Sequence, residues 1–227
     1  MTPSALFLGS IGVLTETSDL QRRAFNAAFE RHGLDWHWDA RDYREMLQDQ
    51  GGRARIAAFA EAQGEEVDVD AIYAAKQGAF GDLVREEGTP ARPGVLDIME
   101  AARDLGMQRA FVTSTSAAQV RTVFAGLKEA LTPADFAYIG DRAHVEAPKP
   151  APDIYLHAME VLSLTPADIL AVEDTPESAE AALKAGLRVI GFPGEAAQGR
   201  AFPDGVAVVE FLSPALLSTG LTRIAAE

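Results

Sequence analysis

Three short stretches of the chain carry side chains that could hold a phosphate group together with a divalent cation. Hydroxyls gather at Thr113-Ser114-Thr115-Ser116, Lys149 stands between two prolines, and two acids are adjacent at Glu173-Asp174. Hydroxyl and ammonium groups bind phosphate oxygens, and carboxylates are ligands that magnesium prefers. Each stretch also has a structural explanation, as a helix N-cap, a rigid turn or an acidic helix start. Only their meeting in one place would make them a site.

Short apolar segments alternate with helical periodicities through the second half of the chain. Residues 108–112 and 169–172 are predicted strands, and they end directly before the hydroxyl cluster and the acid pair. The other elements predicted in this region are strands 136–139 and 187–192 and helices 94–105, 117–127, 152–162 and 176–185. Such alternation is typical of a parallel sheet covered on both faces, in which ligands bind beyond the carboxyl ends of the strands. We therefore expect the hydroxyls, the lysine and the acids to converge on one crevice.

A helical region interrupts this pattern early in the chain. Residues 5–8 form the first predicted strand, and no strand-like alternation follows between residues 18 and 87. The spacing of apolar residues there predicts helices over 18–33, 39–48, 53–63 and 68–87. The expected fold class is α/β, with a Rossmann-like, doubly wound parallel sheet formed by residues 1–14 and 89–227. Residues 15–88 are expected to form an inserted α-helical domain.

Composition narrows the classes of function. The 227 residues include 20 Lys+Arg and 34 Asp+Glu, a net charge of −14, which argues against binding to nucleic acid. Cysteine is absent, and the four histidines lack the paired spacing of a zinc site. No apolar run is long enough to span a bilayer, and no basic leader precedes an apolar stretch at the N-terminus. We expect a cytoplasmic monomer that contacts neither nucleic acid nor membrane.

Several segments resemble the haloacid dehalogenase superfamily of phosphatases and mutases, and within it the CbbY-like sugar-phosphate phosphatases. The similarity lies in Lys149-Pro150-Ala151-Pro152-Asp153-Ile154-Tyr155, in Val172-Glu173-Asp174 and in parts of the insert such as Gly51-Gly52-Arg53-Ala54-Arg55-Ile56. The resemblance implies that the helical insert is a cap. It also implies that the partner is a small phosphorylated ligand or an inorganic anion.

The resemblance assigns roles to eight residues. It implies a phosphate site at Thr113, or at its neighbour Ser114 if the register differs by one, together with Lys149. It implies magnesium ligands at Glu173 and Asp174, and substrate contacts on the cap side from Glu16, Arg55 and Lys76. For Lys76 in particular, a solvated position on a helix is an equally good explanation.

One motif of that family is missing. Its first strand ends in Asp-x-Asp-Gly-x-Leu, in which the first aspartate attacks phosphorus and helps to bind magnesium, while the second acts as general acid and base. Gly12 and Leu14 fix the register, so Gly9 and Ile11 occupy the two aspartate positions. Neither side chain can act as a nucleophile or a proton carrier, and Ser10 between them has no evident base. We therefore assign no catalytic residue and expect magnesium to bind weakly or not at all.

Three hypotheses about function remain open. The chain is a catalytically degenerate phosphatase relative that binds or senses a phosphorylated ligand, or it is an active magnesium-dependent hydrolase of a small phosphorylated sugar. The second hypothesis needs a non-standard base for water, for which Glu16, Glu173 and Asp174 are the candidates. The third is an ordinary phosphatase whose sequence carries substitutions at both motif positions. On the first hypothesis, loss of a carboxylate near Lys149 is expected to leave a pocket that attracts an anion.

Overall fold

The computed structural model describes residues 3–47 and 51–218. Its contacts divide the chain into two compact units, Met1–Glu16 with Thr89–Glu227, and Thr17–Gly88. The first unit takes in Thr15 and Glu16, two residues beyond the boundary expected from the sequence. Thr15 joins this unit because its hydroxyl donates a 2.8 Å hydrogen bond to the carbonyl of Pro90. The other unit is helical throughout its described secondary structure.

A parallel sheet forms the centre of the first unit. Its six strands lie in the order β3-β2-β1-β4-β5-β6, and each neighbouring pair is parallel. The strands are β1 (Ala5–Leu8), β2 (Gln108–Val112), β3 (Tyr138–Gly140), β4 (Ile169–Glu173), β5 (Arg188–Gly191) and β6 (Ala207–Val208). The expected α/β doubly wound class is confirmed. Strand β6 was not predicted, because two residues leave too short a pattern to recognise.

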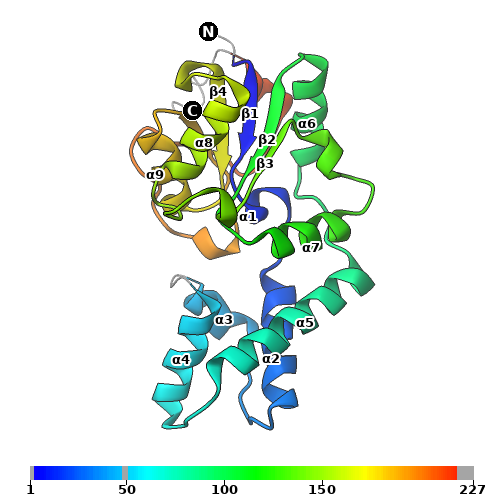
Figure 1. The fold of residues 1–227 in the computed structure, drawn as a ribbon, viewed down its shortest axis with the longest axis vertical. Helices are drawn as coiled ribbons and strands as arrows, with labels where there is room; N and C mark the ends of the chain where they lie inside the picture. Colours follow the sequence, from blue (N-terminus) through cyan, green and yellow to red (C-terminus); the bar gives the residue numbers. More distant parts are fainter. Residues whose placement is uncertain (1–2, 48–50, 219–227) are drawn as a thin grey trace. The chain divides into compact units, whose positions relative to one another are not determined.

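Helices cover both faces of this sheet (Figure 1). Helices α6 (Val95–Asp104) and α7 (Ala117–Leu127) pack on one face, and α8 (Asp153–Leu162) and α9 (Pro176–Lys184) on the other. Alternate residues of β1 divide between the two faces, since Leu6 and Leu8 join one apolar cluster and Ala5 and Phe7 join the other. All four are fully buried, as expected for a strand at the middle of a doubly covered parallel sheet.

Short helical turns shape several connections. A four-residue helix, α1 (Ile11–Leu14), follows β1 where the sequence predicted a loop. Its amide hydrogen bonds are local, with the Thr15 N–H donating to the Ile11 carbonyl at 2.9 Å. The 3₁₀ turns are η1 (Pro133–Asp135), η2 (Arg142–His144), η3 (Pro166–Asp168), η4 (Glu195–Ala197) and η5 (Pro214–Leu217).

The helical unit is built from α2 (Ser18–Arg31), α3 (Ala40–Met46), α4 (Gly52–Gln63) and α5 (Val69–Glu87). Aromatic rings form much of its core, with Trp38 lying 4.8 Å from Phe25 and 4.7 Å from Phe29 between ring centroids. Asp39 and Asp68 cap the starts of α3 and α5 through backbone N–H groups, which explains where those helices begin. Among the described residues, no helix is both long and apolar enough to cross a membrane.

Candidate functional site

Polar side chains gather where the three central strands β2, β1 and β4 end. Gly9 follows β1, Thr113 follows β2, and Glu173 is the last residue of β4 with Asp174 directly after it. The Gly9 N–H donates to the Val172 carbonyl at 2.9 Å, which keeps the ends of β1 and β4 together. The hydroxyl, the acids and Gly9 are therefore at one edge of the sheet, where a parallel α/β fold binds its ligands.

Lys149 is buried at this edge and has a full set of partners. Its ammonium group donates to Glu173 Oε1 at 2.8 Å, to the Tyr155 hydroxyl at 2.7 Å and to the Gly9 carbonyl. An ammonium has three protons to donate, so these contacts account for all of them. Glu173 supplies a negative charge beside Lys149, and the expected attraction of this pocket for an anion stays a prediction. An anion would have to displace one of the three partners to reach Lys149.

Glu173 is fully buried and occupies the space beside Gly9. A Cβ atom on residue 9 would overlap the Oε1 and Cδ atoms of Glu173. Burial raises the pKa of Glu173 to about 7, outweighing Lys149, which lowers it. Oε2 of the same carboxylate is buried with no hydrogen-bond partner among the described residues. The Glu173 carboxylate thus lies where any side chain at position 9 would begin.

Asp174 makes the contact that the sequence did not predict. Its Oδ1 accepts a 2.6 Å hydrogen bond from the Ser10 hydroxyl. An extended strand would have turned Ser10 away from the site, but the chain bends into α1 directly after this residue. Desolvation by the surrounding protein raises the pKa of Asp174, and the Ser10 bond opposes that rise. A serine beside a carboxylate whose pKa is raised is a pair that can hold and move a proton.

The hydroxyl cluster after β2 is already partly used by local structure. Thr113 is 4% exposed, and its Oγ1 accepts a 3.2 Å hydrogen bond from the Thr115 N–H. Ser116 caps α7 by accepting from the Gln119 N–H, which is the structural role considered for it. Ser114 is partly exposed between them. Ser116 is thus used as a helix cap, and a phosphate-binding role for Thr113 and Ser114 stays a prediction.

Arg92 and Glu16 organise the loops around the acids. The Arg92 guanidinium donates to the carbonyls of Gly12, Phe192 and Pro193 at 2.6, 3.0 and 2.7 Å. Glu16 accepts a 2.8 Å hydrogen bond from the Glu195 N–H. The sequence indicated Glu16 as a substrate contact and as one of three candidate bases, and it indicated no role for Arg92. A partly buried arginine bonded to carbonyls of distant loops leaves no local sequence signal.

Arg55 and Lys76 belong to the helical unit. Lys76 is 3% exposed and lies over the rings of Phe25 and Phe80, 4.8 and 5.3 Å from their centroids. It donates to the side-chain oxygens of Gln21 and Gln77. Burial, followed by the nearby positive charge of Arg55, lowers the pKa of Lys76 to about 7. Lys76 is therefore not the solvated helix residue that the sequence left open.

Comparison with known proteins agrees with this geometry. The model of the haloacid dehalogenase-like hydrolase family matches residues 11–186. This chain belongs to the haloacid dehalogenase-like hydrolases. Protein CbbY of Rhodobacter capsulatus is 34% identical over 205 residues, covering 89% of this chain and 90% of that protein. Protein CbbY of Cereibacter sphaeroides is 37% identical over 186 residues, covering 81% of each.

Solved structures show the same relationship. CbbY from Rhodobacter sphaeroides in complex with phosphate has a TM-score of 0.78 and 33% identity, covering 94% of this chain and 96% of that one. A variant of the same protein in complex with xylulose-(1,5)bisphosphate also has a TM-score of 0.78 and 33% identity, covering 90% and 93%. The resemblance to CbbY-like members of the family is confirmed.

Magnesium is the metal expected of a haloacid dehalogenase-like hydrolase, and the donor set here fits it poorly. Position 9 offers no carboxylate, Glu173 is paired with Lys149, and Asp174 accepts from Ser10. No group of three or more histidine, aspartate or glutamate side chains able to hold a metal ion is found within residues 3–47 and 51–218. A metal held here would have Glu173 Oε2 and Asp174 as its nearest carboxylate donors, with none at position 9 to complete the set.

Proposed function

We propose that this chain is a CbbY-like member of the family that binds a small phosphorylated ligand without forming an aspartyl-phosphate. One observation carries the proposal. The space beside Gly9 is filled by the Glu173 carboxylate, which is paired with Lys149. A carboxylate held in an ion pair and buried against backbone is a structural partner of the lysine, and Ile11 offers no proton carrier two residues on.

The ligand class follows from the relatives and from the groups at the strand ends. The structural neighbours at 33% identity hold phosphate and xylulose-(1,5)bisphosphate, so a sugar phosphate is the natural candidate. Thr113 and Ser114 are proposed to bind the phosphate, joined by Lys149 when one of its present contacts is displaced. By resemblance, the helical unit is proposed to be a cap, with Glu16, Arg55 and Lys76 as ligand contacts. We propose that magnesium binding is weak or absent.

Phosphate release and ligand binding, measured on the same samples, test this function. The protein is incubated with a panel of sugar phosphates and magnesium, and thermal shifts are recorded with the same compounds. Saturable shifts without metal-dependent phosphate release are expected. Release that Asp174→Ala abolishes would contradict the proposal. Absence of any shift would contradict ligand binding.

The contact between Ser10 and Asp174 favours a second candidate, a hydrolase with a non-standard base. In that case Asp174, whose pKa is raised, accepts a proton from Ser10 or from a water in the same place. Turnover would then fall after both Ser10→Ala and Asp174→Asn. On the first proposal there is no turnover to lose, so the two variants separate the candidates.

A further inference from the structure

A cavity lies in the first unit, away from the carboxyl ends of the strands. It has a volume of about 180 Å³ and is lined by four residues of α6, by Arg109 of β2 and by three residues between α7 and β3. Arg109 is the second residue of β2, whereas Thr113 follows its last. At about 3.3 Å per strand residue, the two positions are about 13 Å apart along the strand. The cavity is thus separate from the site described above.

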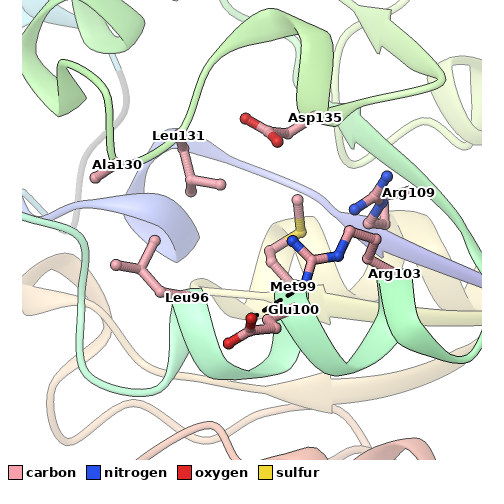
Figure 2. Close-up of a pocket in the computed structure, with 8 residues that line it drawn as sticks. All are labelled: Leu96, Met99, Glu100, Arg103, Arg109, Ala130, Leu131 and Asp135. Carbon is pink, nitrogen blue, oxygen red and sulfur yellow. Dashed lines mark hydrogen bonds and ion pairs between the residues drawn. The ribbon is translucent and has the colours of Figure 1, made fainter.

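The cavity has an apolar side and a charged side (Figure 2). Leu96, Ala130 and Leu131 lie on one side, and the guanidinium groups of Arg103 and Arg109 lie on the other. Small-molecule sites typically combine an apolar wall with a few polar groups that fix the orientation of the ligand. Such a division suits a ligand with one charged end and one apolar end.

Arg109, which lines this cavity, has an unsatisfied hydrogen-bond donor. Its Nε is buried and has no partner among the residues that the structure describes. A buried donor without a partner is costly, so each such group in a folded protein calls for an explanation. Strand alternation puts Arg109 on the same face as Phe111, at the edge of the apolar cluster under α6. An arginine in this position presents a planar fork of donors to whatever enters the cavity.

The other charged groups of the cavity are already partnered. Arg103 is paired with Glu100 and with Asp104, both at 3.0 Å. Asp135 accepts two hydrogen bonds from Thr132, from its N–H at 2.8 Å and from its hydroxyl at 2.9 Å. The carboxylates of Glu100 and Asp135 would repel a doubly charged phosphate, while a single negative charge opposite Arg109 is tolerated. The lining therefore favours a monocarboxylate.

We propose that this cavity binds a small monocarboxylic acid with a short apolar chain. The carboxylate bonds to the terminal nitrogens of the Arg109 guanidinium, and the chain contacts Leu96, Met99 and Leu131. No step of this proposal uses the strand-end site, so its test is independent of the proposed function.

Methionine methyl NMR with hexanoate as the probe tests the proposal. Met99 lines the cavity, and Met159 lies in the apolar cluster on the other face of the sheet, where it serves as an internal control. Hexanoate is expected to shift the Met99 methyl signal with a Kd on the order of 1 mM and to leave Met159 unchanged. Hexanol, which lacks the charge, and inorganic phosphate, which lacks the chain, are expected to bind at least about tenfold more weakly.

Two arginine variants give the decisive comparison. Arg109→Met keeps the apolar stem and removes the fork, so hexanoate affinity should fall at least about tenfold while the fold is retained. Arg188→Met is the matched control, because Arg188 lies in the same row of the sheet across Leu6 and Leu170 but does not line the cavity. Unchanged hexanoate binding in Arg109→Met, equal binding of hexanol, or no Met99 shift in the parent protein would overturn the proposal.

Discussion

Adding a single side-chain carbon at position 9 should disturb the buried ion pair between Lys149 and Glu173. In Gly9→Ala the new Cβ overlaps the Glu173 carboxylate, which has to move and so disturbs its 2.8 Å contact with Lys149. Breaking one partner from a buried ion pair typically costs about 3–5 kcal/mol. We expect Gly9→Ala to lower the free energy of unfolding by about 3 kcal/mol, although it adds only one methyl group.

A double-mutant cycle shows whether the two positions share one space. Glu173→Ala alone should also cost about 3–5 kcal/mol, because it leaves the Lys149 charge buried and unpaired. In Gly9→Asp with Glu173→Ala the new carboxylate has room and can pair with Lys149. The combined loss should therefore be at least about 2 kcal/mol smaller than the sum of the losses in Gly9→Asp alone and Glu173→Ala alone.

Urea unfolding followed by far-ultraviolet circular dichroism measures these changes, with the m-value checked in each variant. Gly81→Ala is a suitable control, because a Cβ at that helical position meets nothing within 4 Å. It should stabilise α5 by up to about 1 kcal/mol. A Gly9→Ala variant as stable as the parent, or additive effects in the cycle, would refute the reasoning from shared space.

Three further predictions concern Lys76 of the helical unit and two contacts of the strand-end site. Lys76→Met removes a lysine whose pKa is about 7 in the fold and 10.5 ordinarily. The parent gains stability relative to this variant as pH rises from 7 to 10.5, by up to about 5 kcal/mol, and a pH series of urea unfolding that shows no such gain would contradict the shift. Ser10→Ala should raise the pKa of Asp174 further and cost about 1–2 kcal/mol, as seen by carboxyl NMR titration and urea unfolding. The affinity of Lys149 for an anion should rise as pH falls through about 7, because Glu173 becomes protonated. Phosphate titrations at constant ionic strength that show a falling affinity would contradict this prediction.

The sequence predicted what depends on local pattern. The strands at residues 108–112 and 169–172 and the helices around them could be found because apolar period and turn residues are local signals. Placing Thr113 and Glu173 at one edge needed only the rule that parallel strands share their carboxyl ends. Family resemblance added the register that makes Gly9 and Ile11 noticeable.

Contacts between distant residues could not be predicted in this way. Lys149 is 140 positions from Gly9 and Ser10 is 164 from Asp174, so no window of sequence contains either pair. The sequence showed no base for Ser10 because Asp174, which accepts its hydroxyl, is distant along the chain. The partner of Lys149 could not be predicted either. The sequence shows that position 9 has no carboxylate, but it does not show that the Glu173 side chain reaches the same space.

The arrangement around Lys149 also explains how the fold can exist without a carboxylate at the end of its first strand. A buried ammonium without a counter-charge is expensive, so removal of an acid beside it would ordinarily destabilise the strand ends. Because Gly9 has no side chain, the space beside it is open. Glu173, at the end of the neighbouring strand, fills this space and forms an ion pair with Lys149. The charge balance needed for folding is met inside the sheet edge, whereas an oxygen free to attack phosphorus is a separate requirement. Stability thus requires a negative charge beside Lys149, whereas attack on phosphorus requires a free oxygen in the same place. Gly9 together with Glu173 meets the requirement for stability.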